Sequence, residues 1–144
     1  DNTEKKIWLI FLFYAPVLAH LISITIQIFV DIERPETAIT NSWKLLLEHI
    51  PDRSFPSDHA SVSVAFLVWL YALGYKKVFF AFLPWVILML LSRIIAWVHW
   101  PFDIIVGSLI GILSWYIAIY YLPKIKFVKK FNSFIIRVLA SIKL

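Results

Sequence analysis

The sequence predicts an all-α, polytopic membrane protein built as a bundle of transmembrane helices. Of its 144 residues, 61% are hydrophobic and only 16% are charged, and the mean hydropathy is +0.82. A soluble domain usually has about 45–50% apolar and about 25% charged residues. The apolar residues also come in runs of about 20, which span a bilayer as helices, and not in the alternating stretches of a membrane barrel. The absence of cysteine excludes disulfides, thiolate metal sites and cysteine nucleophiles.

Four spans are predicted along the chain. They cover Ile7–Val30, Ser57–Tyr75, Val78–Val98 and Phe102–Leu122. Short turns join the last three spans, whereas the polar stretch Asp31–Pro56 separates the first two. We therefore expect residues 1–122 to form a transmembrane core.

Two amphipathic helices are predicted outside the spans. In the polar loop, an apolar stripe that ends at Pro51 indicates an interfacial helix; the stripe consists of Trp43, Leu46, Leu47 and Ile50. Residues 123–144 form a second unit, a basic amphipathic C-terminal helix with the apolar stripe Phe127, Phe131, Phe134, Val138 and Ile142. We expect it to lie on the cytoplasmic membrane surface and to bind anionic lipids, with a disordered basic tail as the alternative.

The charged residues sort to two sides of the membrane. If the N-terminus is cytoplasmic, ten of the fourteen basic residues and only two of the nine acidic residues lie on the cytoplasmic side. This bias follows the positive-inside rule, and it explains the net charge of +5 without a nucleic-acid partner. The loop Asp31–Pro56 and the region around residues 92–103 then face outward.

Polar residues inside the first span require an explanation, because placing ionisable groups in a membrane costs free energy. His20, Ser23, Gln27, Asp31 and Arg34 follow one another at steps of three and four residues. A helix continued to Arg34 would place all five on one face. For His20, a polar seam that holds helices together is the alternative to a functional role.

The second span opens with Pro56-Ser57-Asp58-His59. Ser57 is a natural N-cap, and the unpaired amides of a helix N-terminus attract anions, phosphate above all. An ordinary cap beside an interfacial histidine is the alternative interpretation.

The third span keeps Arg93 in the outer leaflet, where snorkelling to the interface is the alternative to a functional role. His99 and Asp103 follow at a spacing that lets the carboxylate fix the tautomer of the imidazole. The same face of the fourth span continues with small residues that allow close helix packing: Gly107, Gly111 and Ser114.

These groups all fall on the outward side, and together they suit phosphoryl transfer. Two arginines and helix amides bind phosphate, a histidine backed by Asp103 can attack phosphorus, and a second histidine can protonate the leaving oxygen. The two carboxylates, Asp58 and Asp103, are too few for a metal site, so we expect no metal and no cofactor. Since the site opens at the membrane face, the expected substrate is a lipid phosphate.

The motifs resemble the three-part signature of the type 2 phosphatidic acid phosphatase (lipid phosphate phosphatase) superfamily. The parts are Arg34-Pro35, then Pro56-Ser57-Asp58-His59, then Ser92-Arg93 followed by His99 and Asp103. The resemblance implies a metal-independent, vanadate-sensitive enzyme in which His99 forms a phosphohistidine, Asp103 orients it and His59 is the general acid. It also implies that Arg34, Arg93 and Ser57 bind the phosphate. We add Asp58 and Gln27 to this phosphate-binding set, although both depart from the family pattern in the way described next.

Three features depart from the family pattern. Gln27 stands where the family usually has Lys, and Asp58 stands where it usually has Gly. Pro-Ser-Asp-His is similar to the bacterial branch that hydrolyses undecaprenyl diphosphate, the bacitracin-resistance type. The family usually has six spans, so either N-terminal helices lie outside this sequence or the chain is a minimal member.

The leading hypothesis is therefore a phosphatase of a lipid phosphate or diphosphate at the outer face of a bacterial cytoplasmic membrane. Undecaprenyl diphosphate is the favoured substrate, followed by lipid A 1-phosphate and then by phosphatidylglycerophosphate or phosphatidate. A non-catalytic relative that binds or transports lipid phosphates is the main alternative; Gln27 favours it, whereas His59, His99 and Asp103 argue against it. A purely structural membrane protein would leave the outward cluster as coincidence. The oligomeric state is not predicted.

Overall fold

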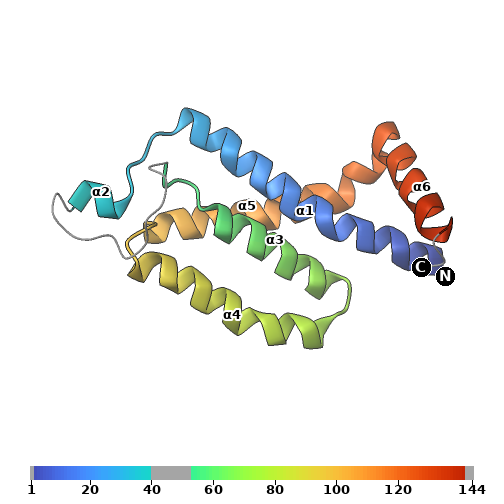
Figure 1. Cartoon of the computed structure of the whole chain (residues 1–144), viewed down its shortest axis with the longest axis horizontal. Helices are drawn as coiled ribbons and strands as arrows, with labels where there is room; N and C mark the ends of the chain where they lie inside the picture. Colours follow the sequence, from blue (N-terminus) through green and yellow to red (C-terminus); the bar gives the residue numbers. More distant parts are fainter. Residues whose placement is uncertain (1, 40–52, 142–144) are drawn as a thin grey trace.

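The computed structural model describes residues 2–39 and 53–141. In chain order its elements are α1 (Asn2–Phe29), α2 (Pro35–Ile39), α3 (Asp58–Ala72), α4 (Lys76–Ile95), α5 (Pro101–Tyr120), the 3-10 turn η1 (Leu122–Lys124) and α6 (Lys126–Ser141). The described residues contain no strand. Each predicted span corresponds to one long helix, α1, α3, α4 or α5, and these four run side by side in alternating directions (Figure 1). The all-α prediction is therefore confirmed.

Helices α1, α3 and α5 form the centre of the bundle. Their contact is made largely by small side chains, and the buried apolar cluster consists of Ala15, Ala19, Ala65, Trp69, Ile110 and Ala118. The glycines of α5 lie directly on α3: a Cβ added to Gly107 would be 2.5 Å from the carbonyl oxygen of Ser57. A Cβ on Gly111 would be equally close to the carbonyl oxygen of Ser61. The predicted small-residue face therefore allows α5 to touch the backbone of α3.

Helix α4 packs against α3 and leaves most of its apolar side chains on the outside. Phe80 is 60% exposed and Trp85 is 71% exposed, and no residue of this helix is fully buried. Helix α4 and the segment Pro101–Lys124 are long and apolar enough to cross a membrane, and Phe13–Phe29 is a shorter apolar helix. Such a continuous apolar exterior is a liability in water but is solvated by lipid. The surface thus agrees with a membrane location.

Helix α1 ends earlier than the polar periodicity predicts. It stops at Phe29, and residues 30–34 are not helical, so Asp31 and Arg34 do not share the helical face of Gln27. The prediction of one common face was wrong for these two residues. Pro35 disfavours a helical conformation in the residue before it, and it then occupies the first position of α2.

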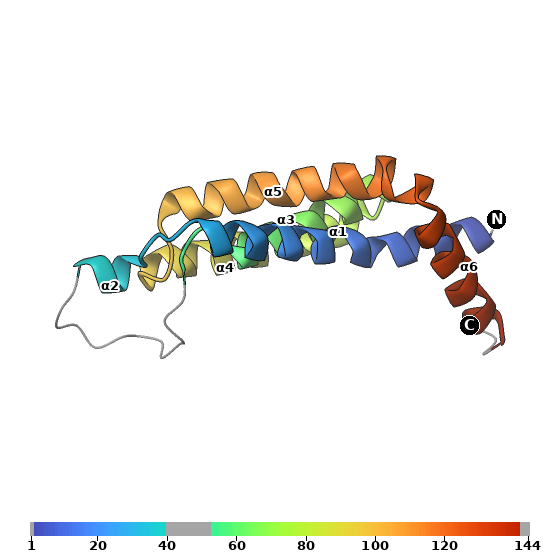
Figure 2. The same ribbon diagram turned by 90° about the horizontal axis from the view of Figure 1, so that it is seen from above.

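Helix α6 lies across one end of the bundle (Figure 2). It is tied to α1 by a hydrogen bond from the hydroxyl of Tyr14 to Oδ1 of Asn132, at 2.7 Å. Its aromatic residues Phe127 and Phe134 stay largely exposed. The N-terminus of α1 and the turn between α3 and α4 lie at this same end (Figure 1), so the basic segments gather as predicted. The interfacial helix predicted around Trp43–Ile50 falls outside the described residues.

Candidate active site

Three chain segments meet at the end of the bundle that carries α2 (Figure 1). They are residues 30–36, 53–59 and 97–103. Main-chain hydrogen bonds join them: Ser54 N to Ile32 O at 3.0 Å, Ser57 N to Asp103 O at 3.2 Å, and Glu36 N to Trp97 O at 3.1 Å. The three N–H groups that donate these bonds have no acceptor within a helix. The structure thereby brings together Arg34-Pro35, Pro56-Ser57-Asp58-His59, and His99 with Asp103.

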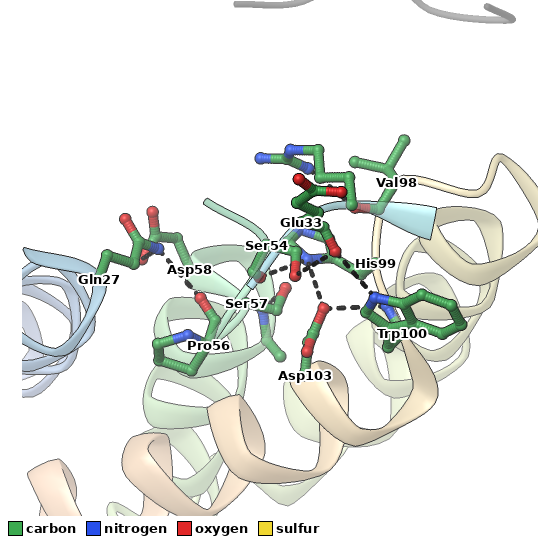
Figure 3. Close-up of polar contacts among 12 residues, drawn as sticks. Gln27, Glu33, Ser54, Pro56, Ser57, Asp58, Val98, His99, Trp100 and Asp103 are labelled. Carbon is green, nitrogen blue, oxygen red and sulfur yellow. Dashed lines mark hydrogen bonds and ion pairs between the residues drawn. The ribbon is translucent and has the colours of Figure 1, made fainter. Parts of the chain in front are cut away.

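His99 is buried in the site and has a close main-chain acceptor (Figure 3). It is 5% exposed, and its Nδ1 lies 2.9 Å from the carbonyl oxygen of Ser54. A carbonyl can only accept a hydrogen bond, so Nδ1 carries the proton and donates it. The other ring nitrogen, Nε2, then has a free lone pair, which is the state required of a nucleophile.

Asp103 lies on the same side of the imidazole but slightly farther away. Its Oδ2 is 3.5 Å from Nδ1 of His99, and it also accepts the backbone N–H of Trp100 at 2.9 Å. The carboxylate therefore caps the first turn of α5 while it faces the histidine, and it is 1% exposed. The predicted pairing of His99 with Asp103 is present, but the nearest acceptor for the ring is the carbonyl of Ser54.

The second histidine pairs with an arginine from the neighbouring helix. Nε2 of His59, in the first turn of α3, lies 2.7 Å from Nη2 of Arg93 near the end of α4. A guanidinium only donates, so Nε2 of His59 accepts this bond. The Nε–H of Arg93 is buried and has no partner among the described residues.

Arg34 and Ser57 complete the predicted site. Arg34 is buried and donates from Nη1 to the carbonyl of Val98 at 2.9 Å, which holds it against the segment before His99. Ser57 is fully buried, and its hydroxyl accepts from the N–H of Ala60 at 3.4 Å as the N-cap of α3. The hydroxyl thus has the capping role predicted for it, and the positive end of the α3 dipole lies beside the two histidines.

Gln27 and Asp58, the two departures from the family pattern, contact each other (Figure 3). The Nε2 of Gln27 donates to the carbonyl of Pro56 at 3.0 Å and to Oδ1 of Asp58 at 3.3 Å. The same Oδ1 lies 3.9 Å from Nδ1 of His20. Asp58 therefore faces α1, while His59, the next residue, faces α4.

Three contributions to the site were missed by sequence reasoning. The carbonyl of Ser54 holds His99, the carbonyl of Glu33 accepts the indole N–H of Trp100 at 3.0 Å, and Arg53 donates to the main-chain carbonyl of Gln27. All three acceptors are main-chain carbonyl oxygens, which every residue carries, so no residue type predicts them. Arg53 also lies 3.5 Å from Asp31, and only its charge and its place before the motif could have marked it.

No group of three or more histidine, aspartate or glutamate side chains is placed to hold a metal ion within residues 2–39 and 53–141. The site instead presents two arginines, two histidines and a helix N-terminus, which are donors and a nucleophile suited to a phosphate. Activity without a metal stays a prediction to be tested by experiment.

Comparison with known proteins assigns the chain to a family. The family model of the PAP2 superfamily matches residues 8–127. The "Bacitracin transport permease protein BcrC" of Bacillus licheniformis is 31% identical over 134 residues, which cover 92% of this chain and 64% of the relative. The "Putative undecaprenyl-diphosphatase YbjG" of Escherichia coli (strain K12) is 36% identical over 80 residues, 47% of this chain and 34% of the relative.

The chain thus spans less than two thirds of the length of either relative. No solved structure matches it. The superfamily match nevertheless covers all three motif segments, helix α1 from Trp8 onward, and the whole of α3, α4 and α5. On this evidence the chain belongs to the PAP2 superfamily, as its motifs predict.

Proposed function

We propose that the protein hydrolyses a lipid phosphate or diphosphate through a phosphohistidine at His99, without a metal ion. The observation that carries this proposal is the 2.9 Å contact between Nδ1 of His99 and the carbonyl of Ser54. It leaves the lone pair of Nε2 free in a site that also holds Arg34, Arg93 and the N-terminus of α3. A histidine in this tautomer can attack phosphorus directly.

The reaction proceeds in two steps. Nε2 of His99 attacks phosphorus, the bond between phosphorus and the leaving oxygen breaks, and His59 gives a proton to that oxygen. Water then attacks phosphorus and gives a proton to His59, the phosphorus–nitrogen bond breaks with its electron pair returning to Nε2 of His99, and inorganic phosphate is released. Arg34, Arg93 and the α3 N-terminus, capped by Ser57, stabilise the charge on the oxygens in both steps.

His59 must acquire a proton before it can act as the acid. Its Nε2 accepts from Arg93 in the structure, and a nitrogen that accepts has no proton to give. A bound phosphate offers Arg93 a charged acceptor and places negative charge beside His59. Both effects favour the protonated imidazole.

Undecaprenyl diphosphate is the substrate we favour, because the relatives include one named for bacitracin transport and one named as an undecaprenyl-diphosphatase. Asp58 in the second motif supports the same branch. Lipid A 1-phosphate and phosphatidylglycerophosphate are the other substrates to test. We place the protein in a bacterial cytoplasmic membrane with the active-site end facing outward, because the basic segments gather at the other end.

We also propose that residues 1–122 act as the phosphatase core and that α6 rests on the cytoplasmic leaflet. Its lysines carry positive charge, and its phenylalanines are exposed at the end of the bundle. An amphipathic basic helix in this position suits an anionic lipid surface.

The decisive experiment measures phosphate release by the purified protein in detergent with EDTA present. Undecaprenyl diphosphate, lipid A and phosphatidylglycerophosphate are compared, with His99→Ala as the control. We expect release from at least one lipid, none from the variant, and inhibition by vanadate. Release that stops when EDTA is added would overturn the metal-free mechanism, and release by His99→Ala would overturn the nucleophile.

The second candidate function is non-catalytic binding of lipid phosphates. It is favoured by Gln27, which supplies no charge where the family has Lys. Under this alternative the wild type and His99→Ala bind the lipids equally well, and neither releases phosphate.

A further inference from the structure

The two positions at which this chain departs from its family, 27 and 58, are 31 residues apart in sequence and bonded to each other in space. We propose that Gln27 and Asp58 are paired positioning residues that hold the start of α3 in place, and that neither is a phosphate ligand. This inference rests on the proposed phosphatase function and adds two residues to its machinery.

The donor count of Gln27 supports this role. A side-chain amide has two N–H groups, and Nε2 of Gln27 donates to both Pro56 O and Asp58 Oδ1. No amide donor is left for a phosphate unless one of these bonds breaks. Both donated bonds of the Gln27 amide therefore go to the start of α3 and the residue before its N-cap.

The chemistry of Asp58 points the same way. An ionised carboxylate only accepts hydrogen bonds, and so does a phosphate dianion, so the two cannot bond and repel each other. The structure turns this carboxylate toward α1, where Gln27 and His20 face it. At this position it also lies in the first turn of a helix, where a negative charge is stabilising.

The segment that the pair holds is the one that carries the chemistry. On one side, Gln27 fixes the carbonyl of Pro56; on the other, the N–H of Ser57 donates to the carbonyl of Asp103 at 3.2 Å. The start of α3 is thereby clamped between α1 and α5. Since His59 directly follows Asp58, any shift of this turn moves the proposed acid relative to His99.

One turn farther along, a second contact joins the same two helices. The hydroxyl of Ser23 on α1 donates to the hydroxyl of Ser61 on α3 at 2.9 Å, and both side chains are fully buried. The Ser61 hydroxyl in turn donates to the carbonyl of Asp58 at 3.1 Å. This second contact keeps α1 and α3 together when the pair is removed, so variants at 27 and 58 are expected to fold.

A double-mutant cycle tests the pair. Gln27→Ala, Asp58→Ala and the double variant are assayed for phosphate release from the lipid that the wild type prefers. We expect each single variant to lose roughly tenfold in kcat with KM changed by less than about twofold, and the double variant to lose roughly tenfold as well, because both changes remove one shared contact.

Two further variants provide matched controls. Asp58→Asn keeps an oxygen that can accept from Gln27, so we expect its kcat to be several-fold higher than that of Asp58→Ala. Thr25→Ala removes an exposed hydroxyl on α1 that donates to the carbonyl of Leu21 in the same helix, and we expect no change. An Asp58→Asn variant as slow as Asp58→Ala would overturn the inference.

Two other results would also overturn it. Losses that multiply to roughly a hundredfold in the double variant would show that the residues act independently. A raised KM with an unchanged kcat in Gln27→Ala would show a direct phosphate contact. These results require an active wild type, whereas a wild type without phosphatase activity would refute the proposed function itself, so the two failures are distinguishable.

Discussion

At the scale of single residues, the imidazole of His99 has two acceptors with different properties. The carbonyl of Ser54 is nearer, at 2.9 Å, whereas the carboxylate of Asp103 is 3.5 Å away but carries a charge. The carbonyl suffices to fix the tautomer. In the proposed mechanism the ring becomes positively charged when it forms a phosphohistidine, and the carboxylate would stabilise that charge.

Asp103 should therefore have two separable roles. Asp103→Asn keeps an oxygen for the N–H of Trp100 and removes only the charge, so we expect kcat to fall about tenfold with little loss of stability. Asp103→Ala also removes the α5 cap, so we expect a further loss of about 1 kcal/mol in the free energy of unfolding. Rate assays and thermal unfolding of both variants check this, and equal stabilities would contradict the capping role.

Arg93 should not be replaceable by lysine. Its Nη2 donates to His59 while its remaining N–H groups can reach a phosphate, a fork that a single ammonium group does not offer. We expect Arg93→Lys to lower kcat/KM by about tenfold or more, measured as phosphate release from the preferred lipid. An unchanged kcat/KM would mean that Arg93 only snorkels to the interface.

The residue types of the site follow from the sequence, but several of their contacts do not. Histidines, arginines and Asp103 could be found because ionisable groups in apolar spans stand out. The contact of His99 with the carbonyl of Ser54 could not be predicted, because every residue carries a main-chain carbonyl and no residue type marks this one. The contact of Gln27 with Asp58 depends on the axial register in which α1 packs against α3. Local periodicity in the sequence does not encode this register.

At the scale of elements, the N-termini of α3 and α5 meet because α5 has no side chain where it crosses α3. Gly107 lies on the carbonyl of Ser57, the residue that caps α3 and bonds to Asp103. The small-residue face predicted from sequence thus has a direct consequence for the site. Any added atom there separates the two segments that carry His59 and His99.

Gly107→Ala tests this packing. The new Cβ would lie 2.5 Å from a backbone oxygen, which cannot rotate away, so we expect a loss of about 1–3 kcal/mol in the free energy of unfolding and reduced phosphate release. Ser108→Ala, on the same helix, is the control because its hydroxyl donates to the carbonyl of Ile104 within that helix. Equal behaviour of the two variants would contradict the close approach.

Helix α6 gives a second prediction at this scale. Neutralising the charges of Lys126, Lys129 and Lys130 with glutamine should weaken its hold on anionic lipid by about 1 kcal/mol per residue. We expect added phosphatidylglycerol to raise the unfolding temperature of the wild type more than that of the triple variant. Phosphatidylcholine should have the same small effect on both, and an equal response to phosphatidylglycerol would contradict the proposal.

At the scale of the whole molecule, the four long helices separate two chemically different ends. One end carries the basic N-terminal segment, the Lys76-Lys77 turn and α6, and the other carries the candidate active site (Figure 1). The sidedness deduced from charge counting therefore has a structural counterpart. It predicts which end faces the outside of the cell.

Single cysteines test this orientation cleanly, because the chain has none of its own. Glu33→Cys lies at the active-site end and Lys77→Cys at the opposite end, and both positions are exposed. We expect a membrane-impermeant thiol reagent to label Glu33→Cys in intact cells and Lys77→Cys only after lysis. The reverse pattern would mean that the site faces the cytoplasm.

The sequence alone determined the fold class, the four long helices, the packing face of α5 and the residue types of the site. These are properties of composition and local periodicity, because a bilayer selects long apolar runs regardless of how they pack. The tertiary structure decided where α1 ends, that Ser54 rather than Asp103 lies nearest to His99, and that Gln27 meets Asp58. Each of these depends on hydrogen bonds between backbone or side-chain atoms of segments distant in the chain, which form only once the helices have packed.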